Sequence, residues 1–203
     1  MKSLLLSKLF VLLSLLPVLL QAQPTPKDTI PKPEVSVVHR SIRIDGKPVN
    51  YTVTAGTLLL RNDKDEPIAL YGFTAYTKEG VTDMNKRPVM FAYNGGPGSS
   101  SIWLHMGALG PKRTVVNDPG ITPPSPYSLE DNNYSVLDMT DLVMIDPVGT
   151  GLSRPVGKAT GKDFWGVDQD IRTVSLFIKQ YITENDRWNS PKYLLGESYG
   201  TLR

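Results

Sequence analysis

Hydrophobic and polar positions alternate along the chain from Val35 to Thr77, after a proline-rich segment. Alternation with a period of two is typical of strands that bury one face. Polar turns interrupt it at residues 45–46 (Asp-Gly) and 62–67. The pattern therefore predicts an antiparallel meander, with strands at residues 36–44, 51–54, 57–61 and 68–77.

Three short, uninterrupted apolar runs follow, at residues 88–93, 142–145 and 193–195, and each leads into a glycine-containing loop. Such runs suit parallel strands that are buried on both faces. Between the last two, apolar residues recur at helical spacing over residues 167–182, which predicts a crossover helix with Asp170, among other polar residues, on its solvent face. The chain is therefore predicted to be of the α/β class, with loops gathered at the carboxyl ends of the parallel strands.

The N-terminal leader has the pattern of a cleavable signal peptide. Two lysines precede an apolar stretch at residues 9–20, and a plausible cleavage site follows Ala22. A transmembrane anchor is the alternative, but the stretch is short for one and Pro17 interrupts it. We therefore expect a secreted or periplasmic protein that has no membrane attachment after cleavage.

The remaining chain divides into two parts. Residues 23–34 contain four prolines and predict a linker. Residues 35–203 then form one domain, which is predicted to be the N-terminal part of a larger fold.

Composition excludes several classes of protein. The 203 residues include 22 Lys+Arg, 20 Asp+Glu, 40% hydrophobic residues and no cysteine, which is ordinary globular composition without a disulfide scaffold. Without the two lysines of the leader the charges balance, so no nucleic-acid-binding face is expected. The two histidines, His39 and His105, are too few and too scattered for a metal site, and no cofactor is expected.

The clearest chemical signal is G-x-S-x-G at residues 196–200 (Gly-Glu-Ser-Tyr-Gly), directly after an apolar run. A sharp strand-to-helix turn needs small residues two before and two after its serine. Such a turn would raise the Ser198 hydroxyl above the sheet. It would also offer the backbone N–H of Tyr199 to a developing oxyanion.

A second glycine-rich segment follows the first apolar run, at residues 94–101. Consecutive glycines let backbone N–H groups approach an anion closely. A phosphate loop is the alternative, but G-x-x-x-x-G-K-[ST] is absent here and also at residues 152–159. An oxyanion loop fits better, because a nucleophile elbow needs a second N–H donor from an earlier loop.

Four segments in this order resemble the serine carboxypeptidase family, which has the α/β-hydrolase fold. They are residues 94–100 (Asn-Gly-Gly-Pro-Gly-Ser-Ser), 110–111 (Gly-Pro), 145–153 (Ile-Asp-Pro-Val-Gly-Thr-Gly-Leu-Ser) and 196–200. Residues 35–88 fit the N-terminal strands of that family but carry no motif.

The resemblance implies roles for five residues. Ser198 would be the nucleophile that forms the acyl-enzyme, and Gly96 and Tyr199 would donate backbone N–H groups to the oxyanion. Asn94 and Glu197 would hold the C-terminal carboxylate of a peptide substrate. A carboxyl group beside a carboxylate is tolerable when the two share a proton, and the Asn94 amide can donate. Peptidase activity is therefore expected to be best below neutral pH. A solvated elbow residue is the alternative role for Glu197.

The chain departs from the family pattern at two positions near this carboxylate site. Ala92 stands where the family usually has Trp, and Ala108 where it usually has Glu. Recognition of the carboxylate would then be weaker or supplied otherwise. His105 would share a helical face with Ala108 and could supply a donor, but a packed or surface histidine is the favoured alternative.

The catalytic base and acid are not expected within this chain. Asp146 precedes Ser198, whereas the α/β-hydrolase order is serine, acid, histidine, and both histidines also precede the serine. Asp146 is therefore expected to shape a loop. An unactivated serine is a weak nucleophile, so the chain is expected to be an inactive fragment by itself.

The leading hypothesis is an exported serine carboxypeptidase that releases C-terminal residues from peptides. An acyltransferase or esterase on the same scaffold is one alternative. A non-catalytic, truncated binding module is an alternative of another class. The sequence does not indicate an oligomeric state.

Overall fold

The computed structural model describes residues 30–116 and 125–203. The predicted signal peptide and residues 23–29 of the predicted linker lie outside the described residues, so these boundaries stay predictions. In the part of the chain that is described, no helix combines the length and the apolar character that crossing a membrane requires.

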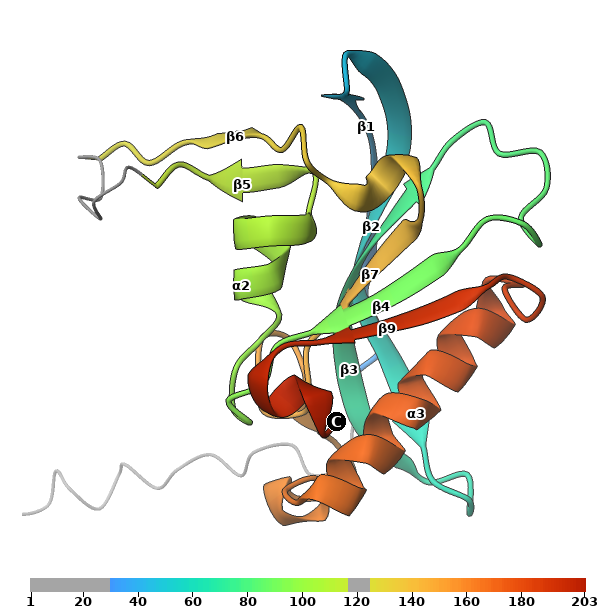
Figure 1. The fold of residues 1–203 in the computed structure, drawn as a ribbon. Helices are drawn as coiled ribbons and strands as arrows, with labels where there is room; N and C mark the ends of the chain where they lie inside the picture. The colour runs from blue at the N-terminus through green and yellow to red at the C-terminus, as the bar shows by residue number, and fades with distance from the viewer. Residues whose placement is uncertain (1–29, 117–124) are drawn as a thin grey trace, which may run out of the picture.

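The central feature is a mixed sheet of seven strands, six of which lie in the order β1-β2-β3-β7-β4-β9 (Figure 1). The seventh strand, β8, pairs with β3. The pairs β1–β2, β2–β3 and β3–β7 are antiparallel, whereas the pairs β7–β4 and β4–β9 are parallel. This arrangement confirms the predicted meander leading into a parallel sheet. The strands are β1 Val35–Ile44, β2 Lys47–Arg61, β3 Pro67–Lys78, β4 Val89–Tyr93, β7 Asp141–Ile145, β8 Arg154–Pro155 and β9 Lys192–Gly196.

One strand prediction is wrong. The separate strands expected at residues 51–54 and 57–61 are a single strand, β2, which runs through Gly56. A Cβ built on Gly56 would lie 2.1 Å from the carbonyl oxygen of Glu34, and that oxygen accepts a hydrogen bond from the Thr57 N–H. Glycine at this position therefore admits a neighbouring backbone and does not end the strand.

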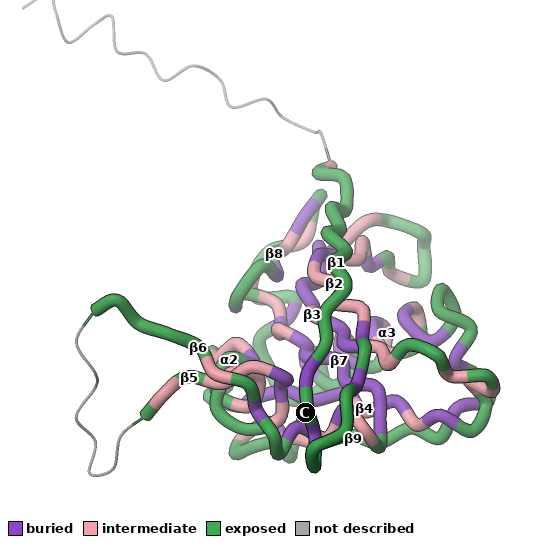
Figure 2. Tube along the Cα trace, turned by 90° about the horizontal axis from the view of Figure 1, so that it is seen from above, coloured by how far each residue is buried: buried purple, intermediate pink, exposed green. Residues whose placement is uncertain are grey.

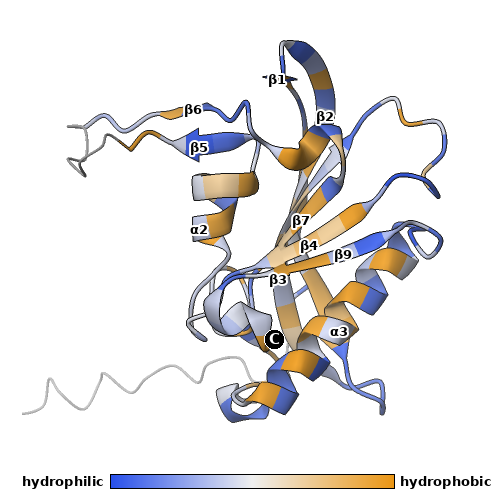
Figure 3. Ribbon diagram, in the orientation of Figure 1, coloured by the Kyte–Doolittle hydropathy of each residue, from blue (hydrophilic) through white to orange (hydrophobic). Residues whose placement is uncertain are grey.

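Helices cover both faces of the sheet (Figure 1). The α3 helix, Val167–Glu184, packs on one face, where its Val174, Phe177 and Tyr181 belong to the same core cluster as residues of the strands. Figure 3 shows that hydrophobic and hydrophilic positions alternate along this helix. It connects β7 to β9, with β4 between them, and confirms the predicted crossover. The other face carries α2 Ile102–Leu104, η2 His105–Leu109 and η3 Val136–Asp138.

The remaining elements are short. Strands β5 Lys112–Thr114 and β6 Leu129–Asp131 form a separate two-stranded sheet that projects from the body (Figures 1 and 2). The turns η4 Gly161–Asp163 and η5 Ser198–Thr201 precede α3 and follow β9.

The core has two layers, one on each side of the parallel strands. On β7, Val143 and Ile145 face the layer that contains Phe177 and Tyr181 of α3, while Met144 faces the opposite layer. Both faces of β4 and β7 are therefore apolar and buried, which explains the first two apolar runs in the sequence. The prediction of a buried strand is wrong for the third run, because β9 is the last strand in the order of the sheet and its Tyr193 and Leu194 are 54% and 63% exposed. Figure 2 shows buried positions concentrated in these central strands. Full burial of each large apolar side chain contributes about 1.5–3 kcal/mol.

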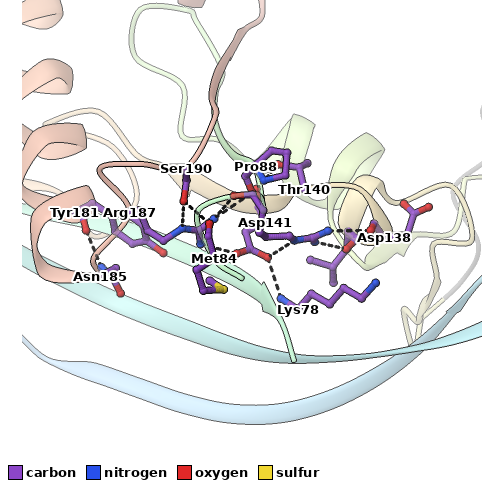
Figure 4. Close-up of polar contacts among 12 residues, drawn as sticks. Lys78, Met84, Pro88, Asp138, Thr140, Asp141, Tyr181, Asn185, Arg187 and Ser190 are labelled. Atoms are coloured by element: carbon purple, nitrogen blue, oxygen red, sulfur yellow. Dashed lines mark hydrogen bonds and ion pairs between the residues drawn. The ribbon is translucent and has the colours of Figure 1, made fainter. Parts of the chain in front are cut away.

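A buried ion cluster joins the amino ends of the parallel strands (Figure 4). Asp141, at the start of β7, accepts hydrogen bonds from Arg87 at 3.1 Å and from Arg187 at 2.6 Å. The two guanidinium groups also donate to backbone carbonyls, among them those of Asp138 and Pro88. All three charged side chains are less than 10% exposed. The cluster therefore ties β7 to the segments that precede β4 and β9.

We predict that Asp141→Asn lowers the free energy of unfolding by about 3–5 kcal/mol, because two buried guanidinium groups would lose their counter-charge. Glu130→Gln is the matched control. It removes the exposed Arg113–Glu130 pair and should cost less than about 1 kcal/mol. Urea denaturation of the purified variants measures both values. Equal, small effects of the two substitutions would contradict this role of the cluster.

Candidate active site

The turn after β9 places Ser198 in a strained backbone conformation. Its φ angle is +57°, in the left-handed region that non-glycine residues rarely adopt. A Cβ on Gly196 would lie 2.3 Å from the Gly200 carbonyl oxygen, and one on Gly200 would lie 2.8 Å from that of Tyr93. Only glycine therefore fits at both positions. The turn leaves the Ser198 side chain exposed at the carboxyl edge of the sheet.

The glycine-rich loop after β4 is in direct backbone contact with this turn. A Cβ on Gly95 would lie 2.4 Å from the backbone nitrogen of Tyr199 and 2.8 Å from the carbonyl oxygen of Glu197. Gly96 follows with a φ of +108°, and the Ser99 N–H closes the loop on the Gly95 carbonyl at 3.0 Å. The two loops therefore meet without any side chain between them.

This contact brings the two predicted donors to the same region of the edge. Within residues 30–116 and 125–203, neither the Gly96 N–H nor the Tyr199 N–H donates a hydrogen bond. Backbone donors are normally paired, and those that are held in place without a partner are available to an anion. The arrangement can stabilise negative charge that develops on a carbonyl oxygen next to Ser198.

Asn94 and Glu197 form a hydrogen-bonded pair beside the turn. The Asn94 Nδ2 donates to Glu197 Oε2 at 3.0 Å, and the Asn94 Oδ1 accepts from the Leu104 N–H at 3.0 Å. The second bond fixes the orientation of the amide and leaves one N–H of Nδ2 for another acceptor. Asn94 is buried, whereas Glu197 is exposed. The pair therefore combines an exposed carboxyl group with a buried amide whose orientation is fixed.

Asp146 lies in the loop after β7 and holds that loop together. Its carboxylate accepts a hydrogen bond from the Ser101 N–H at 2.9 Å and fills the space beside Gly151. Burial raises the pKa of Asp146, and backbone hydrogen bonds from Ser101 and Leu152 oppose that rise. In the described part of the chain no hydrogen bond joins it to Ser198. This geometry fits the expected loop-shaping role.

Neither histidine is placed to act on the serine. The ring of His105 packs edge-on against Tyr76, with 5.5 Å between the ring centres, and its Nε2 shares a hydrogen bond with the Tyr76 hydroxyl. Burial lowers the pKa of His105 to about 4, so the ring is neutral at neutral pH. His39 lies on the outer strand β1 and pairs with Glu79 at 2.7 Å. His105 is therefore a packed histidine, and not a charged donor.

The two alanines that depart from the family pattern differ in burial, because Ala92 is buried and Ala108 is exposed. Ala92 is completely buried in β4, in the layer that contains Met144 and Leu104. Ala108 lies in η2, where its carbonyl accepts a hydrogen bond from the Asn132 side chain at 2.7 Å. Neither residue offers a polar side chain for recognition of a carboxylate.

Sequence reasoning missed two charged residues beneath the glycine-rich loop. Asp170 was expected on the solvent face of the crossover helix, but it is buried and accepts a hydrogen bond from Arg203 at 2.8 Å. Burial raises the pKa of Asp170, and Arg203 opposes that rise. The only signal for Arg203 in the sequence is its place five residues after Ser198, and nothing there indicates its partner.

We predict that Gly95→Ala lowers the free energy of unfolding by about 1–3 kcal/mol, because the new methyl group would force the two loops apart. Gly107→Ala is the matched control. A Cβ at Gly107 meets nothing within 4 Å, so alanine in this helical turn should be neutral or stabilising. Denaturant unfolding measures the difference. Tolerance of alanine at residue 95 would disprove the close contact.

We also predict that His105 makes the fold less stable in acid. With a pKa near 4 in the folded state and 6.5 unfolded, the unfolded chain binds the proton first as the pH falls. The contribution of neutral His105 to the free energy of unfolding is fully present above about pH 6.5. It falls by about 3 kcal/mol between pH 6.5 and pH 4. Unfolding measured from pH 4 to 7 should be less pH-dependent in His105→Gln. An NMR titration of the ring with a midpoint near 6.5 would refute the prediction.

Comparisons with known proteins agree with this architecture. The family model for serine carboxypeptidase matches residues 47–201, which is well over half of the chain. Among solved structures, a prohormone-processing carboxypeptidase from Saccharomyces cerevisiae is similar, with a TM-score of 0.54 and 26% sequence identity. That match covers 73% of this chain and 31% of the yeast chain, so this chain spans about a third of the length of that relative. No curated protein sequence matches the chain.

The order of the strands, the crossover helix and the family match confirm the resemblance that the motifs predicted. The chain belongs to the serine carboxypeptidase family, and its mixed sheet is of the α/β-hydrolase type.

Proposed function

We propose that this chain carries the nucleophile part of an exported serine-type carboxypeptidase, which releases C-terminal residues from peptides through an acyl-enzyme on Ser198. The observation that carries the proposal is the contact between the glycine-rich loop and the serine turn. This contact supports Gly96 and Tyr199 as the oxyanion donors, because among the described residues their N–H groups have no hydrogen-bond partner. The leader at residues 1–22 supports a secreted or periplasmic location.

In the proposed reaction the Ser198 hydroxyl attacks the scissile carbonyl and forms a tetrahedral oxyanion. The N–H groups of Gly96 and Tyr199 would stabilise that charge, and removal of one such donor typically costs 100- to 1,000-fold in rate. His39 and His105 are both held by other partners. We therefore assign the general base and its acid partner to residues outside this chain.

The proposed substrates are peptides with a free C-terminus. The remaining N–H of the Asn94 amide would donate to the terminal carboxylate, and Glu197 would share a proton with it. Because that shared proton must be present, binding should be better below neutral pH. No nucleic acid or cofactor takes part in this proposal.

An esterase or acyltransferase is the second candidate. The observation that favours it is the nature of residues 92 and 108, which are alanines without a polar side chain beside the carboxylate site. Such an enzyme would use the same nucleophile and oxyanion donors but would not require a free carboxylate.

We predict that Ser198→Ala abolishes turnover in the whole protein.

Glu197→Gln should raise KM about tenfold for a blocked dipeptide with a free C-terminus, which corresponds to the loss of one charged hydrogen bond. It should change KM much less for the matching ester. Steady-state kinetics on the free acid, the amide and the ester, from pH 4 to 9, measure these effects.

The wild-type enzyme should prefer the free acid over the amide, with an optimum below pH 7. An alkaline optimum for peptide hydrolysis would contradict the proposed carboxylate site. Equal turnover of the acid and the amide would support the esterase or acyltransferase instead.

A further inference from the structure

Arg203 lies beneath the glycine-rich loop and contacts it on both sides of Gly96. Its Nη1 donates to the carbonyl oxygen of Asn94, and its Nη2 donates to that of Pro97 at 2.9 Å. The side chain is 1% exposed. One guanidinium group therefore fixes the Asn94–Gly95 and Pro97–Gly98 peptide groups, one before and one after Gly96.

The same side chain is held from two further directions. Asp170, in the first turn of α3, accepts a hydrogen bond from the Arg203 Nε at 2.8 Å and supplies the counter-charge. The guanidinium carbon also lies 5.4 Å from the ring centre of Tyr199, within the range of a cation–π contact. Arg203 thus joins the glycine-rich loop, the serine turn and α3.

A glycine pair needs such external support. Glycine has more conformational freedom than any other residue, and Gly96 has a φ of +108°. The planar guanidinium group has five N–H donors in a fixed arrangement, whereas a lysine has one compact ammonium group that cannot reach all of these acceptors in the same geometry. Oxyanion donors are effective because they are held in position before the reaction begins. Small shifts of this loop should therefore lower the rate of acyl transfer.

We propose that Arg203 is a positioning residue for the oxyanion hole: it holds the backbones of Gly96 and Tyr199 in register with Ser198, and Asp170 orients it. The inference rests on the proposed function. Arg203 acts through these two backbones and does not touch the substrate.

The test compares Arg203→Lys with Arg187→Lys in the whole protein. Both replace a buried arginine that pairs with an aspartate, but Arg187 lies at the opposite end of the parallel strands. Arg203→Lys should lower kcat for an ester substrate 10- to 100-fold with KM within about twofold. Arg187→Lys should lower the unfolding temperature but leave kcat of the folded enzyme unchanged. Asp170→Asn, which keeps the size of the side chain, should give a smaller loss of kcat than Arg203→Lys.

A second readout does not depend on turnover. Hydrogen exchange of the Ser99 N–H, which closes the loop on Gly95, should be faster in Arg203→Lys and unchanged in Arg187→Lys. Unchanged exchange and unchanged kcat in Arg203→Lys would overturn the inference, as would equal losses of kcat in the two lysine variants. If the wild type shows no Ser198-dependent turnover, the proposed function fails. The exchange experiment then still decides whether Arg203 positions the loop.

Discussion

The close approach of two backbones, at Gly95 and Tyr199, is the constraint on which the rest of the site depends. It follows from the pairing of the strands that carry the two loops. Parallel strands β4 and β9 are neighbours, and Tyr93 at the end of one is in register with Gly196 at the end of the other. The Glu197 N–H donates to the Tyr93 carbonyl at 3.2 Å. The loops therefore leave the sheet side by side, and only glycine at residue 95 lets them touch.

The strain at this edge is balanced by a rigid body below it. Ser198 and Gly96 both have positive φ angles, and a left-handed non-glycine residue costs on the order of 1–2 kcal/mol. The two apolar layers and the Asp141 cluster hold the strands that carry these residues. Lowering the pH would have two opposite effects. It would favour substrate binding at the proposed proton-sharing site, and it would lower the free energy of unfolding because His105 takes up a proton more readily in the unfolded chain. The working pH of the enzyme would reflect both effects.

Local pattern was sufficient for much of this structure. Strands β3, β4 and β7 and the helix α3 could be predicted because the spacing of their apolar residues matches the faces that are buried. The pattern also located β9, but it did not reveal that Tyr193 and Leu194 are exposed at the edge of the sheet. The serine turn and the glycine-rich loop could be found because each needs particular small residues at fixed spacing.

The features that could not be predicted depend on partners far away in the chain. In the sequence Gly56 suggests a break in a strand. Its role is clear only from the structure, where the Glu34 backbone lies against it. Arg203 and the Asn94 carbonyl are 109 positions apart, and no local pattern links them. The same holds for Asp141, whose two arginines lie 54 and 46 positions away. Buried charges of this kind look like solvent-exposed residues in a sequence, because their burial is set by tertiary packing alone.

The central claim is that the oxyanion donors are already in place before substrate binds. A crystal structure of the whole protein with a phosphonate bound covalently to Ser198, compared with the unbound protein, tests it most directly. The account predicts a phosphonyl oxygen within about 3 Å of the backbone nitrogens of both Gly96 and Tyr199, with residues 94–97 unmoved. A phosphonyl oxygen bound by other donors, or a rearranged glycine-rich loop, would contradict it.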